Sequence, residues 1–166
     1  MNAPDAGPVA DAHRLLREHG ATVATAESLT GGRLAALLTG VPGASATYVG
    51  GVVAYATGLK VSLLGVPAGL VEEHGAVSAA CARAMAEGAR SVTGATYALS
   101  TTGVAGPDLQ EGRPAGTVYV GIAGPGGSQA VELALAGDRG AVQDASCAHA
   151  VELLRARLAG EETRLR

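Results

Sequence analysis

The stretch ATVATAESLTGGRLAALLTG, residues 21–40, sets the architecture of the chain. It opens with a short β-branched run typical of a buried strand and closes with a helical run that ends at Gly40. Between the two lie Glu27, Ser28 and Thr30, beside two glycines. A strand that passes through a small polar turn into a helix indicates an α/β domain.

The rest of the chain continues this mixture of elements. Periodicity and turn residues predict further helices over 9–20, 57–65, 78–92 and 138–158, and strands over 47–56, 96–103, 116–124 and 128–137. The last two strands are expected to form an antiparallel hairpin. Together the elements predict an α/β fold with a mixed sheet and helices on its faces. We expect one domain over residues 8–159, with a flexible tail at 1–7 and a charged tail at 160–166.

Composition excludes several classes of protein. The 166 residues carry a net charge of −3, which argues against a general nucleic-acid binder. No apolar run approaches the ~20 residues that cross a bilayer, and the N-terminus has no secretory pattern. Cys81 and Cys147 are too few and too far apart for a disulfide framework or a zinc site, and we expect them to be buried. These features favour a cytoplasmic protein.

Ser28 has two interpretations. It can be the N-cap of the helix that follows, or a nucleophile on a sharp strand-to-helix turn. A capping box would place Glu or Gln three residues later, where Gly31 stands instead. Gly31 and Gly32 weaken a purely structural first turn but allow a ligand to approach the backbone. We expect Ser28 to serve as both cap and nucleophile.

The only lysine of the chain lies in the next candidate cluster. Of the twelve basic residues, eleven are Arg and one is Lys60, five positions after Tyr55. A buried Lys can be neutral near pH 7 and act as a base, whereas Arg cannot. If the strands before Ser28 and Tyr55 are neighbours, Lys60 can take the Ser28 proton and Tyr55 can relay it. The alternative is an interfacial Tyr and a Lys that extends to solvent.

Two further loops carry candidates. TTGVAGP, residues 101–107, is a strand-to-glycine junction in which Thr101 or Thr102 can hold Lys60 or a substrate, although an ordinary turn has the same pattern. In AGDRGAV, residues 136–142, Asp138 is a predicted N-cap and Arg139 can bind a phosphate. His74 is read as a turn residue in a loop. The P-loop and dinucleotide-binding fingerprints are both missing from the sequence.

Six ordered blocks resemble the CinA C-terminal domain family. They are AESLTGG (26–32), GGVVAYATGLKVSLLGVP (50–67), EEHGAVS (72–78), TTGVAGP (101–107), RPAGTVYVG (113–121) and AGDRGAV (136–142). The resemblance runs from about Val9 to Leu158 and is to the stand-alone form of the domain. It implies a three-layer α/β/α sandwich with a mixed, mostly parallel sheet, assembled as a homo-oligomer of two or more subunits.

The resemblance also implies an activity. Family members hydrolyse the carboxamide of nicotinamide mononucleotide to nicotinate mononucleotide and ammonia, without a metal or organic cofactor. Carried over by position, Ser28 is the nucleophile, Lys60 its general base and Tyr55 an aid to proton transfer. The implied substrate-binding residues are Glu27, Thr30, Gly31, Gly32, Thr102, Gly103 and Arg139.

Three departures from the family pattern bear on the substrate. Leu29 stands where Cys is frequent, and Thr57, Gly58 and Leu59 replace a segment that often carries an Asn–Glu pair. Gln143 stands where a second Arg is common, which removes one expected phosphate contact. The alternative function is a non-catalytic nucleotide- or partner-binding domain, linked to competence or DNA damage. Neither function involves nucleic acid or a membrane surface as a direct partner.

Overall fold

A five-stranded mixed sheet forms the centre of the computed structural model, which describes residues 7–164. Its strand order is β2-β1-β3-β4-β5. The strands are β1 (Val23–Glu27), β2 (Tyr48–Val53), β3 (Tyr97–Gly103), β4 (Thr117–Gly124) and β5 (Gly127–Ala134). Strand β1 pairs in parallel with both β2 and β3, whereas β3–β4 and β4–β5 are antiparallel. The predicted mixed sheet and its C-terminal hairpin are confirmed.

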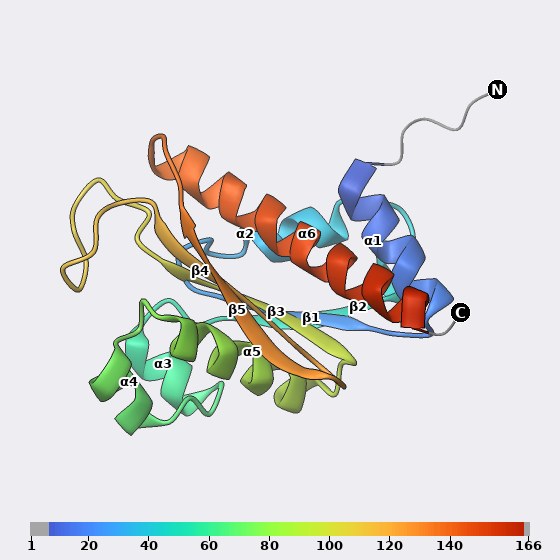
Figure 1. Cartoon of the computed structure of the whole chain (residues 1–166), viewed down its shortest axis with the longest axis horizontal. Helices are drawn as coiled ribbons and strands as arrows, with labels where there is room; N and C mark the ends of the chain where they lie inside the picture. Colours follow the sequence, from blue (N-terminus) through green and yellow to red (C-terminus); the bar gives the residue numbers. More distant parts are fainter. Residues whose placement is uncertain (1–6, 165–166) are drawn as a thin grey trace.

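Helices cover both faces of this sheet, as Figure 1 shows. On one face lie α1 (Gly7–Glu18), α2 (Arg33–Thr39) and the long α6 (Arg139–Arg164), and on the other α3 (Thr57–Ser62), α4 (Ala68–His74) and α5 (Ala79–Thr93). A short 3-10 turn, η1 (Ala44–Ala46), precedes β2. The three-layer sandwich implied by the resemblance is therefore present.

Small side chains allow the layers to pack closely. The chain has no Phe and no Trp, and the face of α5 that is buried against the sheet carries mostly alanines. At Gly88 of α5, a Cβ atom would lie only 1.9 Å from the carbonyl oxygen of Leu64, so only glycine fits. This contact seats the connection between α3 and α4 directly on α5. It fixes the helix that carries Lys60 relative to the sheet.

The sequence reading differs from the structure at three places. The sequence pattern does not predict α4, and His74, a predicted loop residue, is the last residue of this helix. The helix predicted over 57–65 ends at Ser62 as α3, and Pro67 is the N-cap of α4. Helix α6 continues past 158 to Arg164, so residues 160–164 of the predicted tail are helical. Residues 1–6 and 165–166 of the predicted tails lie outside the described residues, and Gly7 begins α1.

Candidate active site

The turn after β1 presents Ser28 at the carboxyl edge of the parallel strands. The Ser28 N–H donates to Thr101 O (2.9 Å), which extends the β1–β3 pairing by one residue, and Ser28 O accepts from Gly31 N (3.1 Å). Gly31 and Gly32 have φ values of 57° and 102°, in the region that favours glycine. Helix α2 then begins at Arg33 with Gly32 as its N-cap. The expectation that Ser28 caps this helix is therefore wrong.

Glu27 takes over the task of capping α2. Its carboxylate accepts hydrogen bonds from the N–H of Leu34 (2.8 Å) and Ala35 (3.1 Å) and from the Thr30 hydroxyl (2.6 Å). The Thr30 hydroxyl also lies 2.7 Å from that of Thr101. Glu27 and Thr30 are each only 1 % exposed. The expectation that they contact the substrate is therefore wrong. Both side chains are buried, and their hydrogen bonds hold the turn in place from within the fold.

Lys60 lies directly beside Ser28. Its Nζ is 2.9 Å from Ser28 Oγ, 2.8 Å from the carbonyl oxygen of Ala54 and 3.1 Å from that of Tyr55. The two carbonyls can only accept, so they take two N–H bonds of the amine. In the neutral amine, the lone pair is then left facing Ser28 Oγ. The arrangement orients Lys60 to remove the proton of Ser28.

Burial favours the neutral form of Lys60. The side chain is 2 % exposed, and desolvation lowers its pKa from the ordinary lysine value, while Cys81 and Glu111 act in the opposite direction. None of the described carboxylates forms an ion pair with Lys60. Burial also raises the pKa of the Cys81 thiol to about 11, so Cys81 is uncharged near neutral pH. A buried amine without a counter-charge suits a general base.

A cavity of about 260 Å³ opens beside Ser28. It is lined by Ser28, Leu29, Tyr55, Gly103, Val104, Ala105, Gly106, Asp108, Leu109, Gln110 and Arg139. Arg139 donates from one guanidinium nitrogen to Gly106 O (2.7 Å) and from the other to the Tyr55 hydroxyl (3.0 Å). The side chain of Tyr55 thus contacts Arg139, while its backbone carbonyl holds Lys60. Among the described residues, no hydrogen bond joins the Tyr55 hydroxyl to Ser28 or Lys60, so its part in proton transfer stays a prediction.

Comparisons with known proteins agree with this architecture. The sequence profile of the CinA C-terminal domain matches residues 7–158. The chain belongs to the CinA C-terminal domain family. It is similar to a CinA-like protein from Frankia casuarinae, at 53% identity over 146 residues, covering 88% of this chain and 34% of that protein. A putative competence-damage inducible protein from Geobacillus kaustophilus is 51% identical over 129 residues, covering 77% of this chain and 31% of that protein. The chain thus spans about a third of the length of these relatives.

Solved structures of CinA superfamily proteins share the fold. One from Klebsiella pneumoniae aligns with a TM-score of 0.89 and 35% identity, covering 92% of this chain and 96% of that one. A competence/damage inducible protein from Agrobacterium tumefaciens aligns with a TM-score of 0.83 and 32% identity, covering 94% and 98%. The domain fold of this CinA chain therefore matches nearly the whole of both proteins.

Of the other predicted site residues of this CinA domain, some line the cavity and others do not. Gly103 lines the cavity, but the Thr102 hydroxyl is buried and donates to Ala76 O (2.8 Å). Gly31 and Gly32 shape the turn and are not among the lining residues. Asp138 accepts from Ala141 N (2.9 Å), which confirms it as the N-cap of α6.

Sequence reasoning missed several residues at the cavity. Asp108, Leu109 and Gln110 line it from the loop after β3, and their only sequence signal was their place between two recognised blocks. Gln143, known only as a departure from the family pattern, donates from its amide to Leu29 O (2.8 Å). It therefore braces the Ser28 turn from α6.

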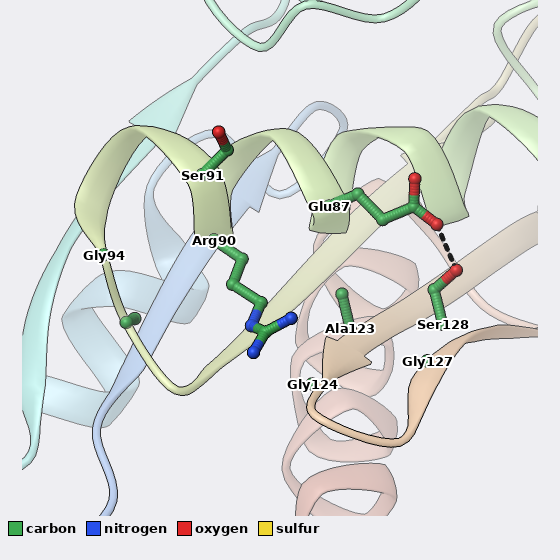
Figure 2. A pocket seen from close by; sticks show the side chains of 9 residues that line it. Glu87, Arg90, Ser91, Gly94, Ala123, Gly124, Gly127 and Ser128 are labelled. Atoms are coloured by element: carbon green, nitrogen blue, oxygen red, sulfur yellow. Dashed lines mark hydrogen bonds between the residues drawn. The ribbon is translucent and has the colours of Figure 1, made fainter.

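A larger cavity, of about 500 Å³, lies away from Ser28 (Figure 2). Its lining residues come from α5, from the segment after it and from the β4–β5 turn. Glu87 accepts from the hydroxyl of Ser128, and Arg90 Nε donates to Thr96 O (2.9 Å). Gly124 is needed there because a Cβ would lie 2.6 Å from the Tyr97 ring. The polar side chains of this cavity are thus engaged in hydrogen bonds that hold the fold together. The smaller cavity is the better candidate for a substrate site, because Ser28 lines it and Lys60 lies beside Ser28.

Residues 7–164 contain neither a candidate membrane span nor a candidate metal site. No helix there combines the length and apolar character that crossing a membrane requires. No group of three or more His, Cys, Asp and Glu side chains there could hold a metal ion.

Proposed function

We propose that this CinA domain hydrolyses the carboxamide of nicotinamide mononucleotide, giving nicotinate mononucleotide and ammonia. The observation that carries the proposal is the 2.9 Å contact between Ser28 Oγ and the buried Nζ of Lys60, at the edge of a cavity. A hydroxyl beside a buried amine whose pKa is lowered by desolvation is the arrangement of a nucleophile and its base. The family resemblance supplies the substrate.

The first step forms an ester between Ser28 and the substrate. Lys60 takes the proton of Ser28 Oγ, and Oγ bonds to the carboxamide carbon while the C=O electron pair moves onto oxygen. The N–H of Ser28 is engaged by Thr101 O, but the N–H of Leu29, which lines the cavity, donates to no acceptor within residues 7–164. We assign this group to the oxyanion, since a preorganised donor stabilises such charge strongly.

The remaining steps release the products. When the oxyanion collapses, the C–N bond breaks and Lys60 passes its proton to the departing nitrogen, which leaves as ammonia. Lys60, neutral again, accepts a proton from water as the water oxygen bonds to the acyl carbon. The bond from Ser28 Oγ to that carbon then breaks, and Oγ recovers the proton from Lys60. Ser28 and Lys60 carry every proton transfer in this scheme.

Arg139 is the proposed phosphate contact, because it is the one cationic residue among those that line the cavity. We expect Arg139→Ala to raise KM for nicotinamide mononucleotide about tenfold or more while kcat changes little. The variant should turn over nicotinamide riboside, which lacks the phosphate, as slowly as wild type does. Steady-state ammonia assays on both substrates measure this difference. Arg83→Ala, at an exposed helical position, is the matched control.

The substrate assignment is tested with a panel of carboxamides. We expect wild type to convert nicotinamide mononucleotide to nicotinate mononucleotide with one ammonia per product, and to act far more slowly on nicotinamide riboside and free nicotinamide. Chromatography of the products, paired with ammonia quantification, distinguishes these cases. Equal rates on the riboside and the mononucleotide would contradict a site selective for the nucleotide.

The lowered pKa of Lys60 predicts the pH dependence of the reaction. Only neutral Lys60 accepts the Ser28 proton, so kcat/KM should rise with pH as Lys60 loses its proton. Because burial lowers this pKa, the midpoint of the rise should lie below the ordinary lysine value of 10.5. A kcat/KM profile, with circular dichroism at each pH as a check on folding, measures the midpoint. A rise centred at or above 10.5 would speak against Lys60 as the base.

A further inference from the structure

The loop between β3 and β4, residues 104–116, forms much of the cavity wall. Its residues from Val104 to Gly106 and from Asp108 to Gln110 line the cavity, and Gly106 O holds Arg139. The far part of the loop turns back on itself, since Gln110 and Arg113 exchange two backbone hydrogen bonds (3.1 and 2.8 Å). The position of this turn therefore governs the position of the wall.

Glu111 lies in that turn and fastens it to the segment between α4 and α5. Its carboxylate accepts from Ala76 N (2.9 Å) and from Val77 N (3.0 Å), in the segment between α4 and α5. The same segment is held to β3 by the Thr102 hydroxyl, which donates to Ala76 O. Hydrogen bonds to a carboxylate are stronger than those between neutral groups. The loop and strand β3 are thus hydrogen-bonded to the same segment, at Ala76 and Val77.

The backbone of Glu111 is in an unfavourable conformation at this contact. Glu111 has φ 54° and is the one non-glycine residue with positive φ among those the structure describes. Such a conformation is uncommon for a residue with a Cβ and persists where its surroundings enforce it. Opposite it, Gly75 leaves room for the carboxylate, because a Cβ there would lie 2.6 Å from Glu111 Oε2.

We propose that Glu111 is a positioning residue, which locks residues 104–116 onto the α4–α5 segment and so fixes the wall of the substrate cavity. The kinetic consequences rest on the amidohydrolase function proposed above. A loop that is ordered only part of the time binds substrate in proportion to the ordered fraction. Loss of the lock should therefore raise KM more than it lowers kcat.

The charge of Glu111 gives a second, separable effect. The ionisable groups that act on Lys60 are Glu111 from the loop and Cys81 from α5, and the negative charge of Glu111 raises the pKa of Lys60. Removing the charge should lower this pKa, so the rise of kcat/KM should move to lower pH. Glu111→Asp keeps the charge but shortens the side chain, so it should raise KM and leave the pH midpoint nearly in place.

The test compares Glu111→Gln with Glu132→Gln, an equal charge change at an exposed position of β5. Hydrogen exchange followed by mass spectrometry should show faster exchange in peptides covering 75–77 and 104–116 for Glu111→Gln only. For nicotinamide mononucleotide, KM should rise about tenfold in that variant, with kcat within about threefold. If Glu111→Gln does not fold, Glu111→Asp carries the exchange and KM measurements.

The outcomes separate the lock from the proposed function. Unchanged exchange in both peptides overturns the lock, whatever the activity. Faster exchange with an unchanged KM overturns its role in fixing the substrate cavity. If wild type releases no ammonia, the proposed amidohydrolase function fails, while the exchange measurement still decides whether Glu111 holds the loop.

Discussion

Lys60→Met is expected to lower kcat/KM for nicotinamide mononucleotide by about 10⁴-fold, the upper range for loss of a general base. Methionine fills a similar volume but cannot accept the Ser28 proton at 2.9 Å. It also cannot return a proton to the departing nitrogen. Steady-state ammonia release by the purified variant, with circular dichroism to confirm folding, gives the measurement.

Lys60→Arg separates catalysis from binding. Arginine keeps the positive charge but stays protonated at any pH a protein experiences, so it cannot serve as a base. An amidohydrolase should lose activity as completely in this variant as in Lys60→Met. If Lys60→Arg retained the activity of wild type, the charge alone would matter, and Lys60 would not be the base.

Glu27→Ala is expected to destabilise the fold by about 3 kcal/mol, because it leaves the N–H groups of Leu34 and Ala35 without their buried acceptor and removes one of the two partners of the Thr30 hydroxyl. For a chain of this length, that corresponds to a fall in melting temperature of about 6–12 °C. Thermal unfolding followed by circular dichroism measures it.

The matched control for Glu27 is Glu72→Ala, at an exposed position of α4. Both substitutions remove one carboxylate, but only Glu27 caps a helix from a buried strand end. Glu72→Ala should change stability by less than about 0.5 kcal/mol. Similar melting temperatures for both variants would contradict the capping role of Glu27.

The meeting of Ser28 and Lys60 could be predicted from the sequence. Each follows a strand with a clear apolar pattern, and neighbouring parallel strands bring their carboxyl ends to one edge of the sheet. Glu27 pairs with Val53 at the ends of β1 and β2, which confirms that the two carboxyl ends lie side by side. The solitary lysine in a chain rich in arginine pointed to the same residue. Spacing and composition therefore sufficed to predict that Ser28 and Lys60 lie together, whereas their roles as nucleophile and base are our proposal.

The supports of the site could not be predicted in the same way. Glu27 caps a helix whose N–H groups lie seven and eight residues later, outside any capping-box spacing. Glu111 reaches backbone groups 34 and 35 residues away, and Gln143 reaches Leu29 across 114 positions. Such partners are set by tertiary packing, and no local pattern encodes them. Sequence patterns identify reactive groups here, while the structure identifies what holds them in place.

The most direct test of the account is the rate of ammonia release from nicotinamide mononucleotide, measured side by side for wild type and Ser28→Ala. The account predicts steady release by wild type, with one nicotinate mononucleotide per ammonia, and a loss of about 10⁴-fold or more in a variant that remains folded. Equal release by the two proteins would contradict Ser28 as the nucleophile, and no release by folded wild type would contradict the proposed reaction.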